Sequence, residues 1–113
     1  MITLWHNPRC SKSRAALALV EASGTAFSLR LYLDDAPSRD ELTALQAKLA
    51  LPVIDMMRTN EAVFRELGLS KTDDDATLLA AMVAHPKLIE RPVLIASNRA
   101  VIARPPEKVH DLL

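Results

Sequence analysis

The sequence predicts an α/β fold in which a strand–helix–strand unit, a helical insertion and a strand–strand–helix unit are built on one four-stranded mixed sheet. Residues 1–5, 11–23 and 26–33 have, in order, the patterns of an apolar strand, an Ala/Leu-rich helix and a strand of alternating polarity. Residues 93–96 and 100–103 are two further apolar runs separated by a tight turn, which is typical of a hairpin. The residues between the two units have only helical patterns, and we expect the whole chain to form one domain.

Turn and helix signals mark the limits of the first unit. Asn7-Pro8 follows the first strand as a turn signal, and Gly24 is placed to end the helix. Two strands joined through a helix of this length form a βαβ unit, so we expect them to run parallel. The helix should bury the face that carries Ser13, Ala16, Leu17 and Val20.

The insertion is expected to contain several short helices. Ser38 and Glu41 have the spacing of a capping box, in which each side chain bonds to the backbone N–H of the other residue. Further helical pieces are expected over residues 53–57 and 61–67, the second closed by Gly68. The residues expected to face inward are Leu42, Leu45, Leu49, Val63, Phe64 and Leu67.

An acidic run at residues 73–75 precedes a helical pattern at 76–84, which His85-Pro86 ends. Negative charge interacts favourably with the dipole at a helix N-terminus. We therefore interpret the run as a solvated cap without a binding role.

The chain closes with a helix that begins at residues 104–107 and carries Val109, Leu112 and Leu113 as its apolar stripe. The bonds Arg91-Pro92 and Arg104-Pro105 lie at element boundaries, and an X-Pro bond that opens a strand is a candidate for the cis form. The order of elements is that of a thioredoxin-type layout with an all-helical insertion.

Composition and charge exclude several classes of function. The 14 basic and 14 acidic residues balance, and only 4% of residues are aromatic, so neither a basic footprint nor a base-stacking surface for nucleic acid is predicted. No apolar run approaches the roughly 20 residues that cross a bilayer, and no signal peptide is apparent. We expect a cytoplasmic protein that binds neither nucleic acid nor membrane, and a lone thiol fits that reducing compartment.

Cys10 is the only cysteine and stands where the first helix is expected to begin. Unpaired backbone N–H groups and the positive end of the helix dipole favour a thiolate over a thiol at such a position. His6, Arg9, Lys12 and Arg14 add charged or chargeable groups nearby. The alternative is a small buried packing residue, but the cationic flanks favour a reactive thiolate that attracts anions.

With one cysteine, no intramolecular disulfide can form, so a redox cycle needs a thiol from outside the chain. Ser13 stands where a Cys-x-x-Cys motif has its second sulfur, and it either donates to the Cys10 thiolate or caps the helix. His6 either assists the thiolate or anchors the loop. His85 and His110 lack metal-ligand spacing with Cys10, so no metal is expected.

Arginines at element boundaries indicate an anion site. Arg58, Arg91 and Arg104 each lie beside a strand end or a helix start, and guanidinium groups suit bidentate binding of oxyanions. Any single arginine is more typical of the surface, but their combination with the Cys10 loop favours a shared site. Tyrosine phosphatases need an arginine six positions after their cysteine, where this chain has Ala16, so that class is excluded.

The segment from His6 to Arg14, His-Asn-Pro-Arg-Cys-Ser-Lys-Ser-Arg, resembles the signature of the glutaredoxin-linked arsenate reductases, thioredoxin-fold proteins with a helical insertion. Nearly the whole chain follows the family's pattern in the same order, through residues 31–33, 37–42, 57–61, 85–86, 89–93 and 104–107. The resemblance implies that Cys10 is the nucleophile, that His6 and Ser13 tune its thiolate, and that the oxyanion is bound by Arg58, Arg91 and Arg104.

The resemblance further implies reduction of arsenate to arsenite, an arsenic detoxification reaction, with no bound cofactor. Cys10 would form a thiol–arsenate adduct, glutathione would be the co-substrate, and a glutaredoxin would resolve the mixed disulfide. Two alternatives stay open. One is a general glutathione-dependent thiol oxidoreductase, and the other is a non-enzymatic regulator of the same fold that binds RNA polymerase.

Overall fold

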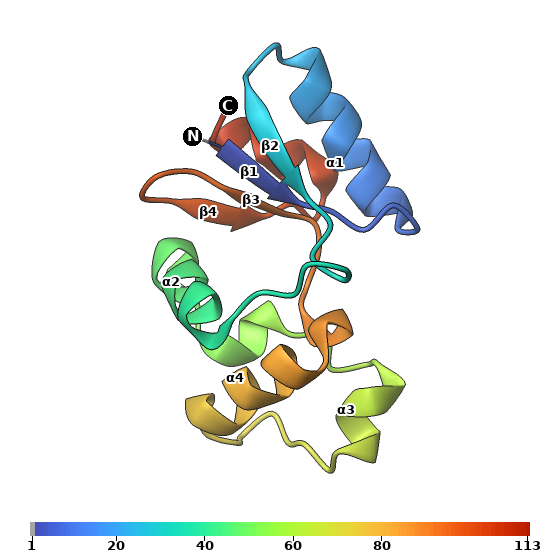
Figure 1. The fold of residues 1–113 in the computed structure, drawn as a ribbon, viewed down its shortest axis with the longest axis vertical. Coiled ribbons are helices and arrows are strands. Elements are labelled where there is room, and N and C mark those ends of the chain that lie inside the picture. Colours follow the sequence, from blue (N-terminus) through green and yellow to red (C-terminus); the bar gives the residue numbers. More distant parts are fainter. Residues whose placement is uncertain (1) are drawn as a thin grey trace. The chain divides into compact units, whose positions relative to one another are not determined.

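The computed structural model describes residues 2–113 and contains a mixed four-stranded sheet with strand order β2-β1-β3-β4 (Figure 1). This confirms the predicted α/β, thioredoxin-like class. The strands are β1 (Ile2–Trp5), β2 (Phe27–Arg30), β3 (Val93–Ile95) and β4 (Ala100–Ile102). The α-helices are α1 (Ser11–Ala22), α2 (Arg39–Leu49), α3 (Ala62–Glu66) and α4 (Asp75–Ala84), and the 3-10 helices are η1 (Val53–Met56), η2 (Pro86–Leu88) and η3 (Pro106–Asp111).

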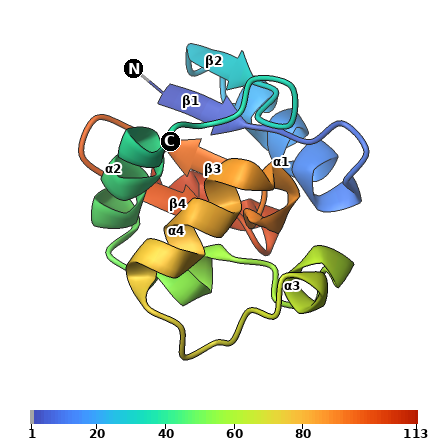
Figure 2. The same ribbon diagram turned by 60° about the horizontal axis from the view of Figure 1, so that its bottom comes forward.

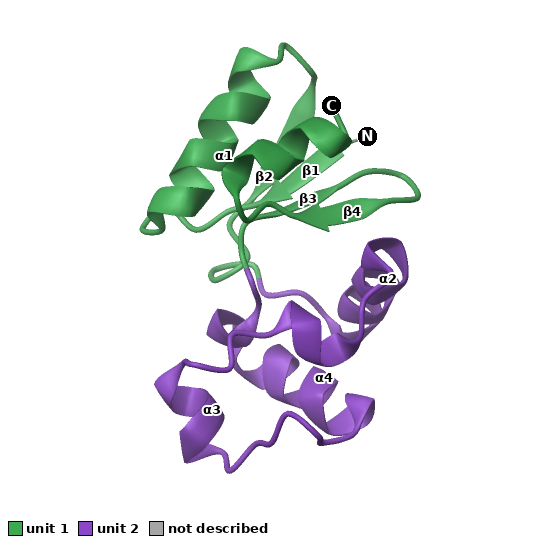
Figure 3. Cartoon of the chain, turned by 180° about the vertical axis from the view of Figure 1, so that it is seen from behind, with its two compact units in different colours: residues 1–35, 91–113 green, residues 36–90 purple. Residues whose placement is uncertain are grey.

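The described chain divides into two compact units (Figure 3). Unit 1 consists of residues 1–35 and 91–113 and contains the sheet, α1 and η3. Unit 2 consists of residues 36–90 and contains the remaining helices. The expectation that residues 1–113 form one domain remains a prediction.

The βαβ prediction is confirmed, but β2 is shorter than the predicted strand at residues 26–33. β1 and β2 lie side by side and point the same way (Figure 2), in a parallel register that ends at the pair Trp5 and Arg30. The His6 N–H donates to the Arg30 carbonyl at 2.9 Å and makes the last bond between these segments. β2 ends at Arg30, and after it the N–H groups of Asp34 and Asp35 both donate to the Leu31 carbonyl.

The core of unit 1 lies where α1 and η3 pack on the sheet. β3 and β4 form the predicted antiparallel hairpin, and β3 also pairs antiparallel with β1. Both X-Pro bonds, Arg91-Pro92 and Arg104-Pro105, are cis. The fully buried core residues are Leu4, Ala16, Val20, Leu94, Ala103 and Val109.

Unit 2 is organised around α4, which packs against α2, η1 and η2. The capping box is present, because Ser38 accepts from the Glu41 N–H and the Glu41 carboxylate accepts from the Ser38 N–H. The acidic run caps α4 as expected, with Asp74 accepting from the Thr77 N–H at 2.9 Å.

The prediction that two leucines face inward is wrong. Leu67 is 45% exposed because α3 ends at Glu66 after little more than one turn, and Gly68 then takes a left-handed conformation that redirects the chain. Leu113 is 36% exposed because the last helix is the 3-10 helix η3, which ends at Asp111. A 3-10 helix has three residues per turn, so the apolar stripe of an α-helix does not continue along it. No helix within residues 2–113 is both long enough and apolar enough to cross a membrane.

Candidate active site at the start of α1

The β1–α1 loop is held by short backbone bonds that place Cys10 at the N-cap of α1. The Cys10 N–H donates to the Asn7 carbonyl at 3.0 Å, and the Arg14 N–H donates to the Cys10 carbonyl at 3.0 Å. The Arg14 guanidinium also donates to the Pro8 carbonyl at 2.9 Å, which ties the loop to the first turn of the helix. The predicted strand–loop–helix arrangement around the cysteine is therefore confirmed.

Several groups around the sulfur together favour its ionised form. Partial burial by itself raises the pKa of the Cys10 thiol, but the backbone N–H of Ser13, the guanidinium of Arg91 and the backbone N–H of Lys12 outweigh it and lower that pKa below its ordinary value. The Cys10 side chain makes no capping hydrogen bond to the helix in this structure. The groups named above lower the pKa because they interact more favourably with the thiolate than with the thiol. Cys10 is a free thiol of intermediate exposure, open to a reactant.

The Ser13 hydroxyl lies against His6. His6 Nδ1 and Ser13 Oγ are 2.7 Å apart in a buried hydrogen bond, and Ser13 Oγ also accepts from the Asn7 N–H at 3.0 Å. Both side chains are buried, with 4% of His6 and none of Ser13 exposed. Burial lowers the pKa of His6, and the positive charge of Arg14 acts in the same direction; together they outweigh the hydrogen bond to the Ser13 backbone and the charge of Glu21, which raise that pKa. His6 is therefore favoured in its neutral form and anchors the reactive loop.

Arg91 and Arg104 are brought together in unit 1. The Arg104 guanidinium donates to the Arg91 carbonyl at 3.0 Å, and both side chains are half-buried. Arg91 also stabilises the Cys10 thiolate by hydrogen bonding and by charge. Two of the three predicted oxyanion-binding arginines are thus linked to each other, and one of them helps to lower the pKa of Cys10.

Arg58 belongs to unit 2 and is held by two carboxylates there. Its Nε donates to Glu61 at 3.1 Å, and its Nη1 lies 3.7 Å from Glu90. The side chain is 17% exposed, so the pairs are partly shielded from solvent. Its backbone N–H is fixed by the Leu88 carbonyl at 2.7 Å.

The sequence predicted Cys10, His6 and Ser13 as site residues but not the bond between the His6 and Ser13 side chains. The seven-residue separation between His6 and Ser13 follows no local pairing rule, because a strand end and a helix turn bring them together. Arg91 acts on Cys10 across an even longer separation in the chain. Within residues 2–113, no three His, Cys, Asp or Glu side chains are grouped so that they could hold a metal ion.

Comparison with known proteins places the chain in a family. Residues 5–112 match the model of the ArsC family. A solved structure, an arsenate reductase from Vibrio cholerae, superposes with a TM-score of 0.95 at 45% identity and covers 99% of this chain and 97% of its own.

Sequence relatives extend over the same length. An arsenate reductase of Neisseria meningitidis is 43% identical over 99% of this chain and 97% of its own. An arsenate reductase of Escherichia coli is 40% identical over 99% of this chain and 80% of its own. A family match along almost the whole chain, together with the reactive loop, shows that this protein belongs to the ArsC family.

Proposed function

We propose that this protein is an oxidoreductase that reduces arsenate to arsenite through Cys10. The observation that carries the proposal is the Cys10 sulfur at the N-cap of α1, where backbone N–H groups and the Arg91 guanidinium lower its pKa. A lowered pKa increases the fraction of thiolate, which is the nucleophile that attack on an oxyanion requires. The arsenate reductases among the relatives support arsenate as the substrate.

In the proposed first step, the Cys10 thiolate attacks arsenic and forms an S–As bond, while one arsenate oxygen takes up protons and leaves as water. Guanidinium groups offset the negative charge on the remaining oxygens. Arg91 and Arg104 are proposed to do so from unit 1, and Arg58 is proposed as the third. His6 and Ser13 are proposed to keep the loop in place so that the sulfur faces the substrate.

In the proposed second step, the thiolate of glutathione attacks the Cys10 sulfur. An S–S bond forms, the S–As bond breaks, and its electron pair remains on arsenic, which is thereby reduced from As(V) to As(III) and leaves as arsenite. A glutaredoxin thiol then attacks the glutathione sulfur and releases the Cys10 thiolate. The chain has no second cysteine to do this work, which supports an external thiol. No bound cofactor is needed, because both electrons come from thiols.

The proposed cellular location is the cytoplasm, since glutathione and glutaredoxin keep thiols reduced there. The proposal is tested by measuring arsenite formation with arsenate, glutathione and a glutaredoxin, and with each component left out in turn. Arsenite should form only when both thiol partners are present, and Cys10→Ser should abolish it. A wild-type protein that reduces glutathionylated substrates but not arsenate would instead support the general thiol oxidoreductase.

A further inference from the structure

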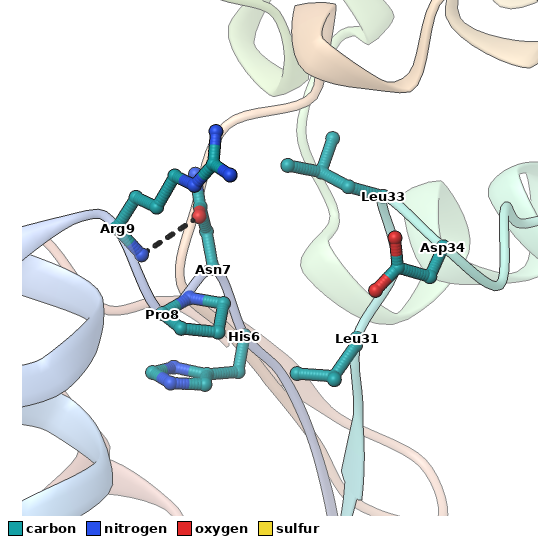
Figure 4. Close-up of a pocket in the computed structure, with 7 residues that line it drawn as sticks. All are labelled: His6, Asn7, Pro8, Arg9, Leu31, Leu33 and Asp34. Carbon is teal, nitrogen blue, oxygen red and sulfur yellow. Dashed lines mark hydrogen bonds between the residues drawn. The ribbon is translucent and has the colours of Figure 1, made fainter.

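A pocket of about 410 Å³ lies beside the reactive loop (Figure 4). One wall is the segment His6 to Arg9, and the opposite wall is formed by Leu31, Leu33 and Asp34. In Figure 4 both leucine side chains and the Asp34 carboxylate point across the pocket toward the loop. The volume falls within the range of about 300–1,000 Å³ that is usual for small-molecule sites.

Both walls are fixed by interactions within each wall and with neighbouring residues. Asn7 Oδ1 accepts from the Arg9 N–H at 3.0 Å and holds the loop in a tight turn. On the other side, the guanidinium of Arg30 lies 5.4 Å from the Trp5 ring centroid and also pairs with Asp35 at 3.3 Å. The Asp34 and Asp35 N–H groups both bond to the Leu31 carbonyl. The pocket is therefore formed before any ligand binds.

The pocket carries one cation and one anion that are not used within the described chain. Among residues 2–113, no side chain forms an ion pair with the Arg9 guanidinium or with the Asp34 carboxylate. Leu31 and Leu33 remain 37% and 43% exposed and give an apolar surface beside these charges. Such a site fits a ligand with an ammonium group, a carboxylate and a short aliphatic chain.

We infer that this pocket binds the γ-glutamyl-cysteinyl-glycine chain of glutathione, with Arg9 contacting a carboxylate and Asp34 contacting the α-ammonium group. Arg9, which lines the pocket, immediately precedes Cys10 in the chain, so the pocket lies beside the loop that carries the proposed nucleophile. The inference rests on the proposed function, in which glutathione attacks Cys10. It adds a binding site for the co-substrate that is separate from the arginines proposed for arsenate.

Charge distinguishes this pocket from an arsenate site. Arsenate carries only negative charge near neutral pH, and the Asp34 carboxylate repels it. Glutathione has both signs of charge, so Arg9 and Asp34 both act favourably on it. A step at this position needs no further reactant, because the glutathione thiolate forms the S–S bond to Cys10 and the S–As bond breaks as described above.

A binding experiment tests the inference without turnover. The full chain carrying Cys10→Ser is titrated with S-methylglutathione, which cannot form a disulfide, and the dissociation constant is measured by NMR or calorimetry. Arg9→Gln and Asp34→Asn should each weaken binding by about two- to fivefold, the range of a partly exposed ion pair. Arg99→Gln and Asp111→Asn remove equal charges from exposed positions outside the pocket and should leave the dissociation constant unchanged.

Modified probes identify which charge meets which residue. The diethyl ester of S-methylglutathione has no carboxylate, so its binding should be insensitive to Arg9→Gln but still weakened by Asp34→Asn. The N-acetyl derivative has no ammonium group, so its binding should be insensitive to Asp34→Asn but still weakened by Arg9→Gln. Equal binding of all probes by all variants, or absence of binding at millimolar concentration, would overturn the inference.

Kinetics separate failure of this inference from failure of the proposed function. If arsenate is reduced, Asp34→Asn should raise the KM for glutathione while the KM for arsenate stays constant. An active enzyme whose KM for glutathione is unaffected by both substitutions would refute the pocket alone. A protein that binds S-methylglutathione through Arg9 and Asp34 but forms no arsenite would retain the pocket and refute the arsenate reaction.

Discussion

Arg91 in unit 1 and Arg58 in unit 2 are the same residue type at similar element boundaries, but their surroundings differ. Arg91 acts on the Cys10 sulfur and lowers the pKa of its thiol. Arg58 is engaged by Glu61 and Glu90, two carboxylates that offset its charge. The two arginines share a position at an element boundary, but the groups around each one determine how much of its charge is offset within the chain.

Removal of the sulfur should have the largest effect, because both arginines then lack the nucleophile that they are proposed to assist. Cys10→Ser should reduce arsenite formation to the rate without enzyme, since a serine hydroxyl at this place is not ionised near neutral pH. The measurement is arsenite production with glutathione and glutaredoxin present. Residual turnover close to that of the wild type would place the chemistry on another group.

Alanine substitutions compare the two arginines directly. Arg91→Ala should lower kcat/KM for arsenate by about 10²- to 10³-fold, the usual loss when one donor to a developing negative charge is removed. It should also raise the pKa of Cys10, measured as the pH dependence of alkylation by iodoacetamide. Arg58→Ala should weaken arsenate turnover but leave the alkylation profile unchanged. Equal alkylation profiles for wild type and Arg91→Ala would contradict the role of Arg91.

The lowered pKa of Cys10 also predicts how stability depends on pH. Between the folded and the unfolded pKa, the unfolded chain binds more protons at this residue, so the stabilisation rises with pH and is complete above the unfolded pKa of about 8.5. It is lost as pH falls through the folded pKa. The free energy of unfolding of the wild type relative to Cys10→Ser should therefore be larger at pH 9 than at pH 6, as measured in urea. A pH-independent difference would mean that the thiol is not perturbed.

Ser13→Ala tests the anchor of the reactive loop. It removes the hydroxyl that bonds to His6 and to the Asn7 N–H, leaving buried polar groups without that partner. The free energy of unfolding should fall by about 1–3 kcal/mol. Ser11→Ala, at an exposed position on the same helix, should change it by less than about 0.5 kcal/mol. Similar losses for both variants would argue against the buried bond.

The smallest effect is expected in unit 2, at the capping box of α2. Ser38→Ala removes the bond from the Glu41 N–H and should lower the free energy of unfolding by about 1 kcal/mol. It should not alter the alkylation profile of Cys10, because none of the groups that lower that pKa lies in unit 2. A change in the alkylation profile would mean that unit 2 also influences the pKa of Cys10, contrary to the difference between unit 1 and unit 2.

Local rules predicted the parts of this molecule that depend on neighbouring residues. The capping box at Ser38, the turn glycines and the position of Cys10 at a helix start were all readable, because each depends on a few adjacent positions. The end of β2 could not be predicted in this way, because it depends on where its partner strand β1 ends. The exposure of Leu67 was missed for a similar reason, since the pattern does not show how short α3 is.

The candidate site shows the same division. The residues that flank Cys10 predicted that its thiolate is favoured, whereas the bond between His6 and Ser13 and the action of Arg91 on Cys10 depend on tertiary packing. The pocket between Arg9 and Asp34 was also missed, because its walls come from two loops that the parallel pairing of β1 and β2 brings together. The pairing of Arg58 with Glu90 follows from the fold of unit 2, because Glu90 is distant in sequence, whereas Glu61 is only three residues from Arg58.

The bond from the His6 N–H to the Arg30 carbonyl has a dynamic consequence. It directly follows the last register pair of β1 and β2, Trp5 and Arg30, and β2 is an edge strand of the sheet. Edge strands open more readily than central strands. When the end of β2 separates from the neighbouring segment, the His6 N–H is the first to lose its hydrogen bond. Hydrogen–deuterium exchange at the His6 amide would therefore report how often the edge of the sheet opens. The same rate would indicate how rigidly the loop that carries Cys10 is held when no substrate is bound.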